Sequence, residues 1–189
     1  MSKKIFAGLD EVGRGCLAGP VISCALIFKK NINKKYIKDS KTISFNNRVR
    51  IAKYIKNNSW YSIGVASVKE IDKYNIFNAT LLSMERAAKK LKKKPHIFLI
   101  DGTHAPKKLR NSKTIIKGDQ KIKCISAASI VAKVYRDLYM IKLGSKFPKY
   151  KWYKNFGYGT WQHLSALRKF GVTNHHRKTY KPVYNILSK

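Results

Sequence analysis

The sequence predicts an α/β fold built on a mixed β-sheet, and two observations lead to this prediction. Three strand-like segments follow one another near the N-terminus, and strand-like and helix-like segments alternate after them. Successive strands readily pair antiparallel, whereas strands joined through a helix pair parallel, so one sheet should contain both arrangements. With 189 residues, 44% of them hydrophobic, the chain suits one domain with a substantial core.

Short apolar segments supply the expected strands. The first is IFAGLD (5–10), and the second, GPVISCALIF (19–28), is almost wholly apolar after its Gly-Pro entrance. WYSIGVASV (60–68) is the third. HIFLID (96–101) is expected to be a short buried strand, and SKTIIKGD (112–119) a further short strand that runs into Asp119.

Apolar residues at helical spacing predict four helices. They cover 45–55 with Ser44 as N-cap, about 75–93 up to Pro95, about 126–142, and 161–170 between Thr160 as N-cap and Gly171. The first three should bury the faces Phe45, Val49, Ala52 and Ile55; Phe77, Leu81, Met84, Ala88 and Leu91; and Ala127, Ile130, Val134, Leu138 and Ile141. The segment 144–159 is expected to be irregular, and it is basic and aromatic.

The charge is strongly unbalanced. The chain has 41 Lys and Arg against 9 Asp and Glu, which gives a net charge of +32 and a pI of 10.2. Such an excess attracts phosphates in a salt-sensitive way, so a nucleic acid is the expected partner. A/T-rich codons, which favour Lys, Asn, Ile and Tyr, are a competing source of part of this charge.

Other features exclude several classes of protein. The longest apolar run, VISCALIF (21–28), has the length of a strand and not of a membrane span, and MSKKIFAGLD lacks the apolar core of a signal peptide. The three cysteines form no CxxC pair, which argues against a disulfide framework and a thiolate zinc site. His175 and His176 lack a spaced partner ligand. We therefore expect a cytoplasmic protein without a membrane or thiolate-metal role.

Four of the few acids come after expected strands: Asp10, Glu11, Asp101 and Asp119. The carboxyl ends of strands are where sites assemble in α/β sheets, and carboxylate oxygens suit Mg²⁺ or Mn²⁺. Two such ions, about 4 Å apart, activate a water and stabilise the leaving oxygen of a phosphodiester. Taken singly, Asp101 and Asp119 are equally explained by turns with Gly102 and Gly118, and the adjacent pair by Arg14.

The acid pair is followed at once by Gly13, Arg14 and Gly15. Glycines let a backbone approach a ligand and expose its N–H and C=O groups, and Arg14 suits a phosphate. An open backbone segment also suits a ribose 2′-hydroxyl, which both donates and accepts hydrogen bonds. A tight turn without a ligand is the alternative, and the following Pro20 and strand exclude a dinucleotide fingerprint.

Seven blocks in this order resemble type 2 ribonuclease H: GLDEVGRGCLAGPV, DSK, YNIFNAT, LIDG, KGDQK, SAASIVAKVYRD and GYGTWQHL. The resemblance runs from about residue 5 to 182. It implies a ribonuclease-H-like fold, with a central five-stranded mixed sheet flanked by helices and a small helical C-terminal part. It also implies endonucleolytic hydrolysis of the RNA strand in RNA–DNA hybrids. Cutting 5′ of single ribonucleotides in duplex DNA, which leaves 3′-hydroxyl and 5′-phosphate ends, is implied as well.

The resemblance assigns roles to residues of this chain. Its metal-binding carboxylates fall on Asp10, Glu11, Asp101 and Asp119, which would hold two Mn²⁺ or Mg²⁺ ions in the substrate complex. Its 2′-hydroxyl contact falls on Gly13, Arg14 and Gly15, and its junction-sensing tyrosine on Tyr158. Further substrate contacts or supports would be Asp39, Ser40, Lys41, Asn75 and Asn78. Asp137 is the competitor for the fourth carboxylate, and beside Arg136 it is expected to be structural.

The implied organisation is one continuous domain, with a catalytic core in 1–145 and a C-terminal part in 146–189 that carries Tyr158. WQHL stands where the family commonly has Lys-Glu-His-Leu, and no sliding-clamp-binding peptide is evident. We expect a monomer whose partners are RNA–DNA hybrids and ribonucleotide-containing duplex DNA. A non-catalytic basic nucleic-acid-binding protein is the alternative, and a different nuclease or integrase on the same fold is a second.

Overall fold

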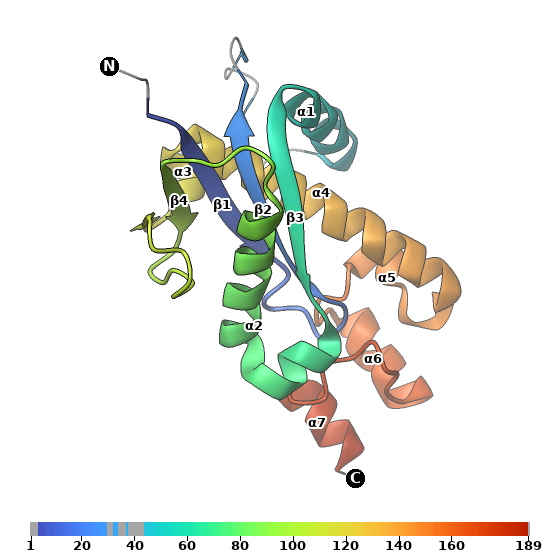
Figure 1. The fold of residues 1–189 in the computed structure, drawn as a ribbon. Helices are drawn as coiled ribbons and strands as arrows, with labels where there is room; N and C mark the ends of the chain where they lie inside the picture. Colours follow the sequence, from blue (N-terminus) through green and yellow to red (C-terminus); the bar gives the residue numbers. More distant parts are fainter. Residues whose placement is uncertain (1–3, 30–31, 34–36, 38–43, 189) are drawn as a thin grey trace.

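A five-stranded mixed sheet lies at the centre of the computed structural model, which describes residues 4–29, 32–33, 37 and 44–188. Its strands are β1 (Phe6–Val12), β2 (Val21–Phe28), β3 (Ser59–Ala66), β4 (Ile97–Asp101) and β5 (Ser112–Ile115), and they lie side by side in the order β3-β2-β1-β4-β5 (Figure 1). β2 pairs antiparallel with β1 and β3, whereas β4 pairs parallel with β1 and β5. The predicted mixed sheet is confirmed.

The register of the two central parallel strands positions the acids. Leu9 of β1 lies opposite Ile100 of β4, so Asp10 and Asp101 each follow a matched pair. Because parallel strands end at the same edge of a sheet, both carboxyl groups arise at one edge. Leu9 and Ile100 face a core cluster with α2 (Val68–Lys90), and side chains alternate along a strand, so Asp10 and Asp101 face the opposite side.

Helices cover both faces of the sheet (Figure 1). One core cluster joins β1, β2 and β4 to α2. On the other face, α1 (Phe45–Asn57) and α4 (Lys123–Lys146) pack against β2 in a second cluster. Gly8 allows α4 to approach β1 closely, because a Cβ at this position would collide with the backbone of Cys124 and Ile125.

The second helix starts earlier than the sequence predicted. α2 begins at Val68 because Ser67 and Glu70 form a capping box, a signal that the apolar spacing did not reveal. The helix is interrupted at Asn75, where φ is 65° and ψ is 167°. Phe77, expected in the buried face, is exposed and packs edge-on against His104.

Three other expectations also need correction. The strand predicted for 112–119 ends at Ile115, and Asp119 lies on a short helix, α3 (Gly118–Lys121). Leu138 was expected in the buried face of α4 but is exposed, because the helix buries mainly its first half. Ser44 precedes α1 as predicted, but its side chain makes no capping hydrogen bond, whereas Thr160 caps the His163 N–H at 3.3 Å.

The C-terminal part packs its own apolar cluster against the end of α4. It contains a 3₁₀ turn (Pro148–Tyr150), α5 (Trp152–Asn155), α6 (Trp161–Phe170) and α7 (Lys181–Leu187). Trp152, Leu167 and Val183 meet Leu17 and Met140 in this cluster. Short helices therefore occur in the segment 144–159, which was expected to be irregular. In the described part of the chain, no helix combines the length and apolarity that crossing a bilayer requires.

Candidate functional site

Three of the predicted acids interact at the edge where β1 and β4 end. Asp10 is buried, and one of its carboxylate oxygens accepts the backbone N–H of Glu11 at 2.7 Å. Ser129 on α4 also hydrogen-bonds to the Asp10 carboxyl. The Asp101 carboxylate accepts the Gly118 N–H at 2.6 Å, which ties the end of β4 to the start of α3. We call Asp10, Glu11 and Asp101 the acid group.

Burial and mutual repulsion disfavour the charged forms of Asp10 and Glu11. Burial raises the pKa of Asp10 well above its ordinary value, and the neighbouring Glu11 and Asp101 raise it further. Burial also raises the pKa of Glu11, while Arg14 opposes that shift. The Arg14 guanidinium lies 3.6 Å from the Glu11 carboxylate, yet the Arg14 side chain is 52% exposed. The ion pair with Arg14, left open as an alternative in the sequence, is thus present, but it compensates only part of the negative charge of the acid group.

Asp119 is placed differently from the other acids. It lies in the first turn of α3, one residue after the Gly118 N–H that binds Asp101. Lys117 precedes it in the left-handed conformation, with φ of 55°. The chain thus turns between β5 and Asp119, and this turn brings the acid back toward the end of β4. Gly102, which follows Asp101, also lies in a turn, with φ of 96°. The turns that the sequence offered as an alternative explanation of Asp101 and Asp119 are therefore present beside both acids.

The donor chemistry of the acid group fits a hard divalent cation. All of its side-chain donors are oxygens, and a cation would relieve the repulsion that raises the pKa of Asp10. Among the described residues, no three His, Cys, Asp or Glu side chains are already gathered as a complete metal-binding group. The acids therefore offer a suitable donor set, and ion binding would require their side chains to adjust.

The Gly13–Gly15 loop, which directly follows β1, is held from beneath by two buried arginines. Arg177 donates to the carbonyl oxygens of Gly13 and Arg14 at 2.6 and 2.7 Å. Arg136 donates to the Pro20 carbonyl at 3.0 Å and to the Phe156 carbonyl at 2.8 Å. We call Arg136 and Arg177 the arginine clamp. Sequence reasoning did not assign them a role, because buried arginines bound to carbonyls leave no local sequence pattern.

Tyr158 lies beside this loop. Its backbone forms a β-bridge with Cys16, and the neighbouring Gly157 carbonyl accepts the Leu17 N–H at 2.7 Å. The Tyr158 side chain is 38% exposed, and the Lys133 ammonium lies 5.6 Å from the centre of its ring. Burial raises the pKa of its hydroxyl to about 12, so the phenol stays protonated at neutral pH. The structure thus brings Gly13–Gly15 and Tyr158 together.

A chain of buried side chains supports the Tyr158 backbone. The Thr173 N–H donates to His176 Nδ1 at 3.0 Å, which requires the neutral His176 to carry its proton on Nε2. His176 Nε2 lies 3.1 Å from His163 Nε2, which also accepts the Trp152 indole N–H at 2.9 Å. His163 Nδ1 then donates to the Tyr158 carbonyl at 2.9 Å. Burial lowers the pKa of both histidines, that of His176 to about 3.

Five candidate substrate contacts remain, of which the structure describes two. Asp39, Ser40 and Lys41 lie outside the described residues. Asn75 and Asn78 are exposed at the kink of α2, where the Asn75 carbonyl oxygen of the side chain accepts the Asn78 N–H at 3.0 Å. Asp137, the competitor for the fourth carboxylate, is buried and forms ion pairs with Lys133 at 2.7 Å and Arg48 at 3.4 Å. These ion pairs are those of a structural acid.

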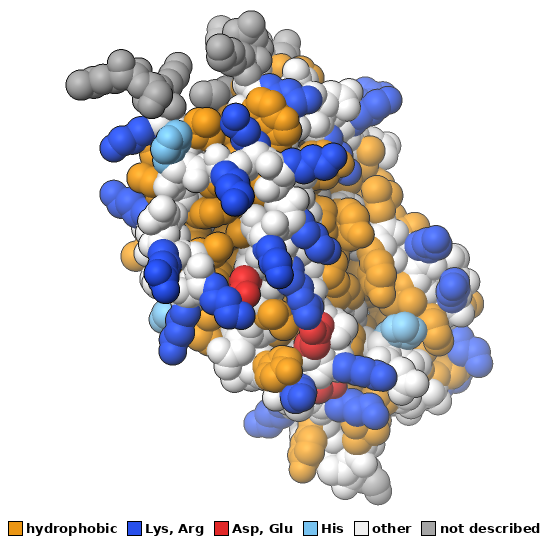
Figure 2. All heavy atoms as spheres, in the orientation of Figure 1, with side chains coloured by type: hydrophobic (Ala, Val, Ile, Leu, Met, Phe, Trp, Pro, Cys, Tyr) orange, Lys and Arg blue, Asp and Glu red, His pale blue; other side chains and the backbone are white. Residues whose placement is uncertain are grey.

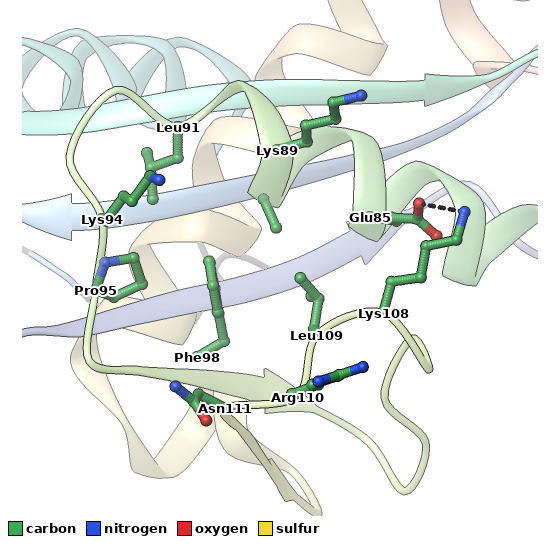
Figure 3. Close-up of a pocket in the computed structure, with 11 residues that line it drawn as sticks. Glu85, Lys89, Leu91, Lys94, Pro95, Phe98, Lys108, Leu109, Arg110 and Asn111 are labelled. Atoms are coloured by element: carbon green, nitrogen blue, oxygen red, sulfur yellow. Dashed lines mark ion pairs between the residues drawn. The ribbon is translucent and has the colours of Figure 1, made fainter.

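On the face shown in Figure 2, Lys and Arg side chains are spread over the surface, with few acids among them. A cavity of about 670 Å³ lies between α2 and the N-terminal half of β4 (Figure 3). Lys89, Lys94, Lys108 and Arg110 lie around it, and Lys108 pairs with Glu85 at 3.0 Å. Phe98 lines this cavity near the start of β4, whereas Asp101 ends that strand. The cavity is therefore separate from the acid group.

Comparison with known proteins identifies relatives over nearly the whole chain. Residues 7–185 match the family model described as Ribonuclease HII. The chain is 54% identical over 186 residues to a ribonuclease HII of Pelagibacter ubique, covering 97% of this chain and 100% of that protein. It is 48% identical over 182 residues to a ribonuclease HII of a Wolbachia from Brugia malayi, covering 96% and 90% of the two chains.

The fold has relatives among solved structures. The ribonuclease H2 of Pyrococcus horikoshii superposes with a TM-score of 0.82 at 23% identity, covering 97% of both chains. A Bst ribonuclease HIII in complex with Mn²⁺ superposes with a TM-score of 0.72 at 15% identity, covering 98% of this chain and 70% of the other. At these identities the likeness concerns the fold, and it confirms the predicted ribonuclease-H-like architecture.

Proposed function

Because the chain belongs to the ribonuclease HII family, and so hydrolyses the RNA strand of RNA–DNA hybrids, we propose that it also cuts duplex DNA 5′ of single embedded ribonucleotides. The products would carry 3′-hydroxyl and 5′-phosphate ends. Family membership already makes the chain an enzyme, which removes the non-catalytic basic protein as the leading alternative. The proposal concerns the finer questions of substrate, site and mechanism.

The proposed catalytic residues are Asp10, Glu11, Asp101 and Asp119. Two Mg²⁺ or Mn²⁺ ions bound there would supply an activated water and stabilise the charge on the leaving 3′-oxygen. The chain's own groups hold the carboxylates in place for this role. The Glu11 N–H orients Asp10, and the Gly118 N–H orients Asp101 at the same edge of the sheet. Asp119, on the turn that follows Gly118, would complete the donor set.

Substrate selection is proposed to lie next to the acid group. Gly13, Arg14 and Gly15 would contact the 2′-hydroxyl of the ribonucleotide, and Tyr158 would stack on the sugar of the following deoxyribonucleotide. The Cys16–Tyr158 bridge supports this pairing, since it joins the two segments directly. The exposed asparagines Asn75 and Asn78, and Asp39, Ser40 and Lys41 outside the described residues, are proposed as further contacts or supports.

The wider proposal divides the chain into a catalytic core, 1–145, and a C-terminal part, 146–189, that carries Tyr158. We further propose that the enzyme acts as a monomer in the cytoplasm. The three free, buried cysteines are consistent with a reducing compartment. The surface rich in Lys and Arg would supply salt-sensitive attraction to the duplex backbone.

One observation carries the proposal: the Gly13–Gly15 loop follows Asp10 and Glu11 directly in the chain, and all of them lie at the edge of the sheet where Asp101 ends β4. β1 ends at Val12, so Asp10 and Glu11 are the two strand residues before its last one, and Gly13 follows directly. A bound ribose at the loop would therefore place its neighbouring phosphate beside the carboxylates. This adjacency supports cutting at a position defined by a single 2′-hydroxyl.

The experiment is cleavage of a labelled DNA duplex that contains one ribonucleotide, with Mg²⁺, Mn²⁺ or EDTA. We expect metal-dependent cutting on the 5′ side of the ribonucleotide, its loss in Asp10→Asn, and weaker ribonucleotide selection in Arg14→Ala. Glu85→Gln is a matched control, because Glu85 pairs with Lys108 beside the separate cavity. Cutting of a long RNA–DNA hybrid together with an intact single-ribonucleotide duplex would overturn the proposal and leave the family activity standing.

A further inference from the structure

In the Gly13–Gly15 loop, the carbonyl groups of Gly13 and Arg14 point toward the interior. Arg177 Nη2 donates to the Gly13 oxygen at 2.6 Å, and Arg177 Nη1 donates to the Arg14 oxygen at 2.7 Å. The Tyr180 hydroxyl donates to the same Arg14 oxygen at 2.5 Å. Arg177 is fully buried, so these bonds form without competition from bulk water.

The direction of these carbonyls fixes the direction of the next N–H groups. In a planar trans peptide, the C=O of one residue and the N–H of the next point in opposite directions. With the Gly13 and Arg14 carbonyls directed at Arg177, the N–H groups of Arg14 and Gly15 point away from it. Arg14 and Gly15 are exposed, so two adjacent backbone donors face the outer side of the loop.

Arg136 fixes the same loop against the Tyr158 segment. Its guanidinium donates to the Ala18 carbonyl at 2.9 Å and to the Phe156 carbonyl at 2.8 Å. It also fills the space next to Gly13, because a Cβ on Gly13 would collide with the Arg136 side chain. Arg136 therefore packs against Gly13 and also links the segment that follows the loop to the segment that leads into Tyr158.

The charges of the arginine clamp lie beneath the loop with neutral partners. In the described residues, the hydrogen-bond acceptors of both guanidinium groups are backbone carbonyls and the Tyr180 hydroxyl. No carboxylate in that set neutralises them. Two unneutralised cations under the outward N–H groups favour an electron-rich oxygen on the outer side of the loop.

We propose that Arg177 and Tyr180 are positioning residues for ribose selection. They hold the Gly13 and Arg14 carbonyls inward so that the N–H groups of Arg14 and Gly15 donate to the 2′-oxygen of the ribonucleotide. A deoxyribose has no such oxygen, so the loss of this orientation weakens ribonucleotide binding more than binding of plain DNA. The inference rests on the proposed function, since it explains how the loop reads the ribose.

Lysine cannot replace Arg177 in this role. Arg177 makes five contacts at once: with the carbonyls of Gly13, Arg14 and Gly19, the last of them twice, and with the Tyr180 hydroxyl. A lysine ammonium keeps the positive charge but is a single point with three donors, so it cannot span these acceptors. Arg177→Lys therefore separates the orientation of the loop from the charge beneath it.

The test compares equilibrium binding of two duplexes in EDTA: one with a single ribonucleotide and the same sequence as DNA only. The measured quantity is the ratio of the two dissociation constants, the ribose preference. Tyr180→Phe removes only the hydroxyl that binds Arg14, and we expect it to lower the ribose preference about threefold. Arg177→Lys should lower it about tenfold, with DNA-only binding unchanged within about twofold.

Tyr150→Phe is the matched control, because the Tyr150 hydroxyl donates to the Gly171 carbonyl at 2.9 Å, outside the loop. It should leave the ribose preference unchanged. The positioning role alone would be overturned if the folded Tyr180→Phe and Arg177→Lys variants kept the wild-type ribose preference. It would also be overturned if both variants bound the two duplexes more weakly by the same factor. A wild-type ratio near one would overturn the proposed reading of the ribose itself, and this inference with it.

Discussion

Two regions of the molecule bury charge in opposite ways. The acid group places like charges side by side, and burial together with mutual repulsion raises the pKa of Asp10 well above its ordinary value. The arginine clamp buries two cations completely, yet every donor described for them reaches a neutral oxygen. The difference teaches what each region is for. A bound cation would relieve the repulsion in the acid group, whereas the charges of the clamp already have hydrogen-bond partners within the protein.

The largest effect that tests this comparison is expected from Asp10→Asn. Hydrolysis should fall about 10³-fold, since one charge-bearing group of the site is lost. The free energy of unfolding should rise by about 1 kcal/mol, because the amide removes a buried like charge and keeps an oxygen for the Glu11 N–H. Hydrolysis rates and urea unfolding of the same preparation measure both. A loss of stability together with activity would contradict the idea that the acids repel one another.

Removing a charge from the arginine clamp should lower stability, in contrast to Asp10→Asn. Arg136→Met keeps much of the side-chain volume but leaves the Ala18, Pro20 and Phe156 carbonyls without their donor. We expect the free energy of unfolding to fall by about 3 kcal/mol, the scale for removing one partner of a buried charged network. Lys108→Met is the control: its ion pair with Glu85 is exposed and should contribute about 0.5 kcal/mol or less. Equal losses of unfolding free energy in the two variants, measured in urea, would show that the buried arginine contributes no more to stability than an exposed ion pair.

Two glycines sharpen the comparison within the loop itself. Gly13 has φ of 94°, and an added Cβ would meet Arg136, which its carbonyl bonds prevent from moving aside. Gly13→Ala should therefore lower the free energy of unfolding by about 2 kcal/mol. Gly15 has open space where a Cβ would lie, so Gly15→Ala should change it by less than about 0.5 kcal/mol. Thermal unfolding of both variants measures the difference. Equal losses of stability would mean that Arg136 moves aside to accommodate the added Cβ.

The smallest expected effect is the loss of stability on lowering the pH. Burial lowers the pKa of His176 to about 3, below the value near 6.5 of an unfolded histidine. Between these values the unfolded chain binds a proton that the folded chain does not, so stability falls as the pH falls below about 6.5. From pH 7.5 to 5.5, His176 alone should remove about 1.4 kcal/mol of unfolding free energy.

Unfolding at the two pH values, in the wild type and in His176→Phe, measures this contribution. The variant should be less stable at neutral pH, because Thr173 and His163 lose their partner, but it should lose less stability on acidification. An identical pH dependence in the two proteins would contradict a lowered pKa of His176, because a group with the same pKa in the folded and unfolded chains contributes nothing to the pH dependence of stability.

The sequence predicted the sheet well, because the strands are short apolar runs bounded by turn residues. It also placed Asp101 at the end of its strand, which β4 confirms, whereas Asp10, expected to end the first strand, lies two residues before the end of β1 because the pairing with β2 continues to Val12. It missed the early start of α2, where Ser67 and Glu70 cap the helix outside the apolar pattern. The strand expected to reach Asp119 ends at Ile115, and the left-handed Lys117 that follows cannot continue a strand.

The support of the candidate site was beyond prediction from the sequence, and the reason is physical. Arg177 binds the Gly13 and Arg14 carbonyls across 164 and 163 residues, and carbonyl groups are present at every position of a chain. No local pattern marks which carbonyl a distant arginine will meet. The same holds for His163 and His176, whose partners are a backbone carbonyl, an indole and each other.

The bridges that join Cys16 to Tyr158 and Ala18 to His176 have a consequence for synthesis of the chain. During translation, the loop after β1 emerges early, whereas the segments that complete it emerge last. A nascent or prematurely terminated chain can therefore contain all four carboxylates and still lack the scaffold that orients Gly13–Gly15. If the loop selects ribose as proposed, this selection is acquired only at the end of translation.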